Sequence, residues 1–181
     1  MTAFFTADTH FGHANALKFG RDAAFSSVDE MDAEMIRRWN DVVSVKDDVY
    51  HLGDFTLRGL VDARRYWSLL RGRVHLVHGN HDQRTVRKAD FWASSQPYLE
   101  IQVEGRHLVL CHYALRVWNR AHYGALMLYG HSHGNLPGNA QSTDVGVDAW
   151  DFRPVTLDGV LARLATLKPF RTEDHHVTRL D

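Results

Sequence analysis

Residues 2–10 read TAFFTADTH, a short apolar run that ends at Asp8 and His10. The run favours a strand and stops at a polar turn, so it predicts a short buried strand. Four further stretches repeat this arrangement of an apolar run followed at once by polar side chains. They are VYHLGD at 49–54, VHLVHGNH at 74–81, HLVLCH at 107–112 and LMLYGHSH at 126–133.

The segments between the first three runs have the spacing of amphipathic helices. Ser27 and Glu30 have capping-box spacing, which predicts a helix start. The apolar face of this helix consists of Val28, Met31, Met35 and Trp39. The apolar face of a second helix consists of Leu60, Ala63, Trp67 and Leu70, with Gly72 near its end. The order strand, helix, strand, helix, strand is typical of a parallel α/β arrangement.

In the second half of the chain, strands follow one another. Residues 99–103 and 107–112 flank Glu104-Gly105-Arg106, which predicts a hairpin. We expect a strand at 126–129, short β segments around 145–147 and 153–155, and a final helix capped by Thr156. The polar residues 170–181 are expected to form a loose tail or a crossing to a partner. Because no repeat or linker divides the chain, one domain over residues 1–181 is expected.

Composition narrows the function classes. The chain has 181 residues, of which 44% are hydrophobic and 24% charged, as in ordinary globular proteins. A net charge of -1 argues against a track for long nucleic acid, so attraction for an anion must be local. The start MTAFFTADTH is not typical of a signal peptide, and no apolar run approaches the length of a membrane span. We therefore expect a cytoplasmic protein without a membrane partner.

The polar groups at the five strand ends are typical metal ligands. Strands of an α/β sheet present ligands at their carboxyl ends, so these groups are expected to meet at one edge. The candidates are Asp8, His10, Asp54, Asn80, His112, His131 and His133. Without metals, two like charges would crowd this edge at considerable cost. Two divalent cations, the two aspartates and a bridging hydroxide leave about one positive charge, which suits a phosphate ester.

Spacing supports this metal site. Asp8 and His10 are two residues apart, as are His131 and His133, so both members of each pair can point the same way. Three glycines precede ligands at tight turns, where the backbone bends sharply or approaches an ion: Gly53, Gly79 and Gly130. A single cysteine, Cys111, excludes a cysteine-rich zinc site and is read as a small strand residue.

The order Asp-x-His, Gly-Asp, Gly-Asn-His-Asp, His, Gly-His-x-His resembles the calcineurin-like metallophosphoesterase family. The resemblance spans Asp8 to His133, and residues 8–15 are similar to the motif Asp-Thr-His-Phe-Gly-His-x-Asn of a small bacterial subgroup. It implies an α/β (α+β) fold, a β-sandwich of two facing mixed sheets flanked by helices. The stretch GDFTLRG at 53–59 lacks the second aspartate of the phosphoprotein phosphatases, so a protein phosphatase is not expected.

The resemblance also implies a role for each candidate. The ligands of the first metal would be Asp8, His10 and His133. The ligands of the second would be Asn80, His112 and His131. Asp54 would bridge both metals, and His81 would lie beside the scissile phosphate without binding metal. The mixed imidazole and carboxylate set makes manganese the first choice, with iron, nickel, cobalt, zinc and magnesium as alternatives.

These residues predict a metal-dependent phosphoesterase that hydrolyses phosphomonoesters or phosphodiesters. A metal-bridging hydroxide would attack phosphorus while His81 assists the leaving group. Asp82 either orients His81 or serves as a turn or cap aspartate. The expected partner is a small phosphate ester, bound with help from Asn80, His81 and His13. Asn15 shares two readings with His13: a phosphate contact or a structural turn.

Three questions stay open at this point. Arg116, Trp118 and Arg120 either line the substrate groove or form a solvated loop with a packed tryptophan. The alternative functions are a nuclease or cyclic-nucleotide phosphodiesterase and, from another class, a non-catalytic metal-binding scaffold. The sequence does not decide whether the chain forms a homo-oligomer.

Overall fold

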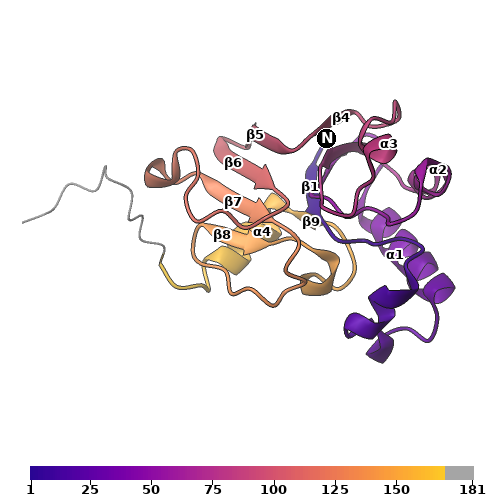
Figure 1. Cartoon of the computed structure of the whole chain (residues 1–181). Helices are drawn as coiled ribbons and strands as arrows, with labels where there is room; N and C mark the ends of the chain where they lie inside the picture. Colours follow the sequence, from indigo (N-terminus) through magenta and orange to yellow (C-terminus); the bar gives the residue numbers. More distant parts are fainter. Residues whose placement is uncertain (170–181) are drawn as a thin grey trace, which may run out of the picture.

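The computed structural model describes residues 1–169, and these form two mixed sheets (Figure 1). In the first sheet the strand order is β4-β3-β2-β1-β9. Its strands are β1 (Ala3–Thr6), β2 (Asp48–His51), β3 (Arg73–Val77), β4 (Ser94–Gln96) and β9 (Val155–Thr156). The first four are parallel, whereas β9 runs antiparallel to β1. The predicted parallel arrangement of the first three strands is therefore confirmed.

The second sheet has the order β5-β6-β7-β8. Its strands are β5 (Tyr98–Val103), β6 (Arg106–Cys111), β7 (Leu126–Tyr129) and β8 (Ser142–Asp144). β5 and β6 form the predicted antiparallel hairpin, and β6, β7 and β8 are parallel. Glu104 and Gly105 close the hairpin with φ of 50° and 76°. Two left-handed residues in a two-residue loop are the requirement of a type I′ turn.

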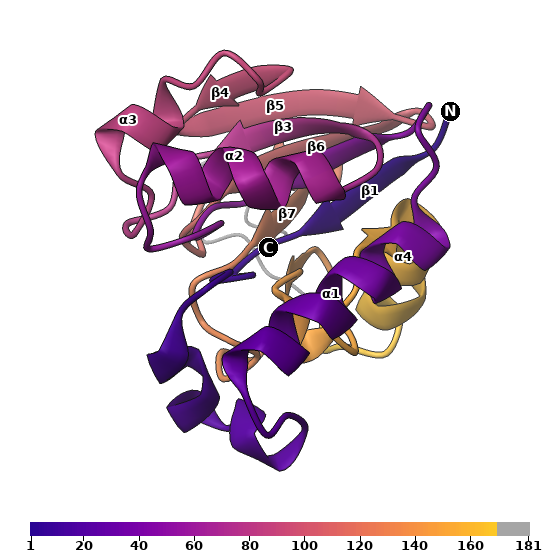
Figure 2. The same ribbon diagram turned by 90° about the vertical axis from the view of Figure 1, so that its right-hand side faces the viewer.

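In the part of the chain that the structure describes, four α-helices and four short 3₁₀ helices accompany the sheets. The α-helices are α1 (Val28–Val42), α2 (Leu60–Leu69), α3 (Arg84–Arg87) and α4 (Leu157–Leu164). The 3₁₀ helices are η1 (Ala14–Phe19), η2 (Arg21–Ala23), η3 (Ala121–Tyr123) and η4 (Val147–Ala149). Figures 1 and 2 show α1, α2 and α3 on the side of the first sheet away from the second sheet. Within residues 1–169, no helix is long and apolar enough to cross a membrane.

Helix starts follow the predicted caps. Ser27 Oγ accepts a hydrogen bond from the Glu30 N–H, and the Glu30 carboxylate accepts one from the Ser26 N–H. Thr156 caps α4 by accepting from the Gly159 N–H. On α2 the buried residues are Ala63 and Tyr66, whereas Leu60, predicted on the apolar face, is exposed.

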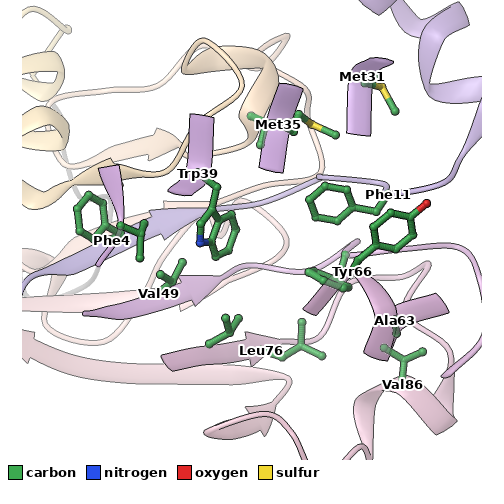
Figure 3. Close-up of a cluster of buried hydrophobic side chains, with 14 of the residues drawn as sticks. Phe4, Phe11, Met31, Met35, Trp39, Val49, Ala63, Tyr66, Leu76 and Val86 are labelled. Atoms are coloured by element: carbon green, nitrogen blue, oxygen red, sulfur yellow. The ribbon is translucent and has the colours of Figure 1, made fainter. Parts of the chain in front are cut away.

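Side chains of β1 point alternately into two cores. Phe4 packs with Trp39 and Met35 of α1 in the layer between the first sheet and the helices, shown in Figure 3. Phe5, the next residue, packs with Leu110 and other apolar residues of the second sheet. This two-layer burial makes the sheets face each other, as the family resemblance implied.

One predicted strand was misplaced. The β segment expected around 145–147 lies earlier, at β8, and Val147 instead begins η4. β8 is fully buried but reads Ser-Thr-Asp. Because these residues are polar, the sequence offers no apolar pattern that would predict the strand. The short elements β4 and α3 were not predicted. The tail expected at 170–181 lies outside the described residues.

Candidate metal centre

The seven candidate ligands lie on loops that leave five strands at one edge of the sandwich. Three of these loops follow β1, β2 and β3 of the first sheet, and two follow β6 and β7 of the second. One group of donor atoms within 4.8 Å of one another comprises Asp8, His10 and His133. A second such group comprises Asp54, His112 and His131. The Asn80 amide oxygen lies 2.9 Å from His112 Nε2, beside the second group.

Asp54 belongs to the second group and also faces the first. Its Oδ2 atom is 3.8 Å from His10 Nε2 in the first group and 3.5 Å from His112 Nε2 in the second. Its other oxygen, Oδ1, accepts a hydrogen bond from the His81 N–H at 2.8 Å. One carboxylate oxygen thus faces both groups, which is the position needed to share a ligand between two cations.

Backbone hydrogen bonds hold the loops after β1 and β2 side by side. The Asp8 N–H donates to the Gly53 carbonyl, and the His10 N–H donates to the Asp54 carbonyl, both at 3.0 Å. The loop after β3 lies so close that a Cβ on Gly79 would overlap the Asp54 carboxylate. A Cβ on Gly130 would lie 2.7 Å from Asp8 Oδ2. These close approaches explain why glycines precede the ligands.

Most candidate ligands have a left-handed backbone. Nine non-glycine residues between positions 1 and 169 have positive φ. Five of the nine are candidate ligands, with φ between 48° and 66°: Asp8, His10, Asp54, His131 and His133. This conformation costs a side-chain-bearing residue of order 1–3 kcal/mol and concentrates at functional sites. The left-handed backbone turns the side chains of neighbouring ligands toward one place, as a metal site requires.

The described residues leave some buried polar atoms of this site without hydrogen-bond partners. Asp8 Oδ1 and His10 Nδ1 are buried and have no hydrogen-bond partner within residues 1–169. Burial, followed by the charges of Asp144 and Asp54, raises the pKa of Asp8 well above its usual value. Burial lowers the pKa of His10 to about 2 and also lowers the pKa of His112. Neutral imidazoles around buried carboxylates are the donor set that a divalent cation completes.

A buried ion pair supports the first group. Arg21 donates two hydrogen bonds of 2.7 Å to the Asp148 carboxylate, and it also donates to the carbonyl oxygens of Asp8 and Thr9. Asp148 Oδ2 lies 2.7 Å from His133 Nδ1, so Nε2 of that ring is left for a metal. Burial raises the pKa of Asp148, but the bonds from His133 and Arg21 outweigh it and hold this pKa low.

Other ligands and loops have their own supports. His112 Nδ1 donates to the Leu52 carbonyl at 2.7 Å, which fixes the tautomer in which Nε2 carries no proton. Asp82 accepts hydrogen bonds from the N–H groups of Asp54, Phe55 and Gly79. Of the two readings of Asp82, the structure therefore supports the turn aspartate. Asp144, which was not predicted, accepts from Gly134 N, Gly146 N and Ser132 Oγ.

His81 lies at the surface of the site. Its ring centroid is 5.6 Å from that of His10. A cavity of about 370 Å³ is lined by His10, His13, His81, His133 and Asn135. His13, a predicted substrate contact, therefore faces the same cavity as His81, whereas Asn15 is exposed outside this lining. Asn135 was not predicted.

The segment that connects β6 and β7 is largely exposed, but Trp118 and Ala121 within it are buried. Trp118 is buried and donates to the Ala125 carbonyl at 2.9 Å, as the packed-tryptophan reading expected. Arg120 lines a cavity of about 420 Å³ with Gln102 and Arg106, at the end of β6 away from His112. This cavity shares no lining residue with the candidate metal site.

Comparisons with known proteins agree with this geometry. Residues 1–145 match the calcineurin-like phosphoesterase superfamily domain. The chain belongs to this superfamily. Its members are metal-dependent, and the fold with two mixed sheets flanked by helices is theirs.

The chain is 30% identical over 178 residues to an uncharacterised protein of Methanocaldococcus jannaschii, and the alignment covers 93% of this chain and 94% of that protein. It is 25% identical over 181 residues to the Gene 66 protein of Mycobacterium phage L5, covering 81% and 86%.

Two solved structures share the fold of this phosphoesterase-family chain. A protein of unknown function from Aquifex aeolicus has a TM-score of 0.69 and 21% identity, with 88% of this chain and 97% of that one covered. An archaeal phosphodiesterase has a TM-score of 0.51 and 16% identity, with 81% and 82% covered. At these identities the likeness concerns the fold.

Proposed function

We propose that the chain is a binuclear metal-dependent hydrolase of phosphate esters. The observation that carries this proposal is the position of Asp54, with Oδ2 facing one three-residue donor group through His10 and another through His112. The two groups, with Asn80 added to the second, supply the seven ligands. Membership of a phosphoesterase superfamily supports the reaction class.

Two bound cations would supply a water of lowered pKa as nucleophile and positive charge for the phosphoryl oxygens. The residues of the chain supply orientation. The His112 Nδ1–H bond to Leu52 and the Asp148 contact to His133 each leave an Nε2 lone pair directed away from its support. The closely packed loops around Gly79 and Gly130 keep Asp54 and Asp8 in place.

His81 is assigned to the leaving group. Its side chain lines the cavity beside the first donor group, while its backbone N–H is bonded to Asp54. Because the ring belongs to neither donor group, it is available to hold or deliver a proton at the departing oxygen. His13 and Asn80 are the proposed phosphate contacts, one from the shared cavity and one from the second donor group.

Manganese is the proposed metal, since imidazole and carboxylate ligands suit it, and iron, nickel, cobalt, zinc and magnesium remain alternatives. The proposed substrate is a small phosphate ester, and the proposed location is the cytoplasm. The test is hydrolysis of p-nitrophenyl phosphate, bis-p-nitrophenyl phosphate and a nucleotide panel by metal-loaded protein. Turnover that needs added manganese is expected, and failure on every substrate with every metal would overturn the proposal.

A further inference from the structure

The candidate metal centre has a second cavity, beside its second donor group. The first cavity is lined by His81 and by His10 and His133 of the first group. The second has a volume of about 280 Å³ and is lined by His78, Gly79, Asn80, Arg87, Pro97, Cys111 and Tyr113. The two cavities share no lining residue, but His81 lines the first and its sequence neighbour Asn80 lines the second.

The two cavities bear on the choice between monoesters and diesters. A phosphate monoester has one organic substituent, and the cavity at His81 accounts for it as the leaving group. Monoester hydrolysis requires no second space for a substituent. A diester has a second substituent that stays on phosphorus through the reaction, and it needs such a space.

The surface of the second cavity suits a flat ring. Tyr113 is 47% exposed and its ring lies edge-on to that of His131, with centroids 4.7 Å apart. Pro97 and Cys111 add apolar surface. Exposed aromatic side chains beside a phosphate site serve as stacking platforms for bases.

The same cavity is lined by one arginine, Arg87. Arg87 donates from Nη2 to the Gly79 carbonyl at 2.5 Å, which holds the guanidinium against the loop after β3. Its Nε–H is buried and has no partner within residues 1–169. Arg87 is the only residue with a fixed charge in this lining, so a polar or electron-rich group is the complement.

We propose that the enzyme acts on phosphodiesters whose retained alcohol carries a nucleoside, with its base held at Tyr113 and Arg87 in this second cavity. The proposal rests on the proposed hydrolase function. It assigns the leaving alcohol to the His81 cavity and the retained nucleoside to the Tyr113 cavity. Water adds to phosphorus, the P–O bond to the leaving alcohol breaks, and the products are that alcohol and a nucleoside monophosphate.

The test compares three substrates with the same leaving group: p-nitrophenyl phosphate, methyl p-nitrophenyl phosphate and thymidine 5′-monophosphate p-nitrophenyl ester. Because p-nitrophenolate leaves in each case, differences in kcat/KM report the retained group. For the manganese-loaded wild type, the thymidine diester is expected to exceed the methyl diester by about 10-fold or more. Tyr113→Ala should lower kcat/KM for the thymidine diester by about 5- to 150-fold, the range of one stacking contact. Its rates on the other two substrates should change less than about threefold, and Tyr113→Phe, which keeps the ring, should retain most of the preference.

Tyr123→Ala is the matched control, because Tyr123 is an exposed tyrosine that lines the separate cavity with Arg120. It should leave all three rates unchanged. Equal loss on all three substrates in Tyr113→Ala would mean that Tyr113 only supports His131, and it would overturn the proposal. A wild type without preference for the thymidine diester would overturn it as well. Release of no p-nitrophenolate from any substrate would instead overturn the hydrolase function.

Discussion

Arg21 and Asp148, which are 127 positions apart in sequence, form an ion pair with two hydrogen bonds beside the candidate metal centre. The Arg21 side chain is 1% exposed and that of Asp148 is 14% exposed. The pair links the backbone carbonyl of Asp8 to the ring of His133, two candidate ligands of one metal that come from opposite sheets. It is therefore a support for the ligand geometry as well as for the fold.

Asp148→Asn should weaken both the stability of the fold and the binding of metal. The change leaves Arg21 buried beside a neutral partner, and removing one member of a buried pair costs about 3–5 kcal/mol. It also alters the hydrogen bond to His133, and such supports are typically worth about 10- to 100-fold in metal affinity or activity. Urea unfolding and manganese titration measure the two effects.

The control for this change is Asp90→Asn. Asp90 pairs with Arg64 at the surface, where the side chains are 83% and 53% exposed. An exposed pair contributes about 0–1 kcal/mol. Equal destabilisation by the two substitutions would show that the Arg21–Asp148 pair does not have the supporting role described here.

His81→Ala should keep the metals and lose rate. The His81 contact to Asp54 is made by the backbone N–H, which the alanine retains. Loss of a positioned proton donor lowers kcat by about 10²–10⁴-fold. Elemental analysis and steady-state kinetics on the same preparation measure both quantities. If the variant loses its metal, the assignment of His81 to the leaving group is wrong.

How much of this site the sequence predicts depends on how local each signal is. Asp8 and His10 are two residues apart and directly follow an apolar run, as do His131 and His133, so their closeness in sequence reveals them. Arg21 and Asp148 have no such neighbour, because their partner is brought to them only by the fold.

The same distinction between local and distant signals decides which strands, and which cavity, the sequence predicts. Strands with apolar runs were predicted at nearly their observed bounds, whereas the Ser-Ser-Gln of β4 and the Ser-Thr-Asp of β8 were not. Their place in a sheet comes from neighbouring strands rather than from their own pattern. Tyr113 likewise follows a candidate ligand in sequence, but only the packing of residues 78–80 and 97 against it shows the cavity that it lines.

The stability of the metal-free protein should fall below about pH 6.5 partly through His51. This residue is fully buried, contacts Thr9 Oγ1, and has a pKa lowered to about 3 by burial and by His112. The unfolded imidazole binds a proton near pH 6.5 but the folded one does not until about pH 3, so acid favours unfolding. The contribution is about 1.4 kcal/mol per pH unit between these values.

His51→Gln tests that contribution, since glutamine still offers a hydrogen bond to Thr9 but does not titrate. Free energies of unfolding at pH 7.5, 6.0 and 5.0 should decline less steeply in the variant, by about one proton. Parallel curves for wild type and variant would exclude His51 as a source of the acid sensitivity.

Removal of metal should lower the melting temperature. Cations that bind only the folded chain stabilise it by about 2.7 kcal/mol at 100 times their Kd, which is about 5–10 °C for a chain of this size. Differential scanning calorimetry with and without manganese measures the shift. Asp54→Asn, which removes the shared carboxylate, should show little shift. An equal shift in that variant would place the stabilising cation elsewhere.

The most direct test of the central claim is the number of cations that the site binds. Isothermal titration of manganese into chelator-treated protein gives this number without any assumption about substrate. Two cations per chain are expected for the wild type, and Asp54→Asn should lose saturable binding in this range. Saturation at one cation per chain, or the same binding curve for wild type and Asp54→Asn, would contradict a binuclear centre bridged by Asp54.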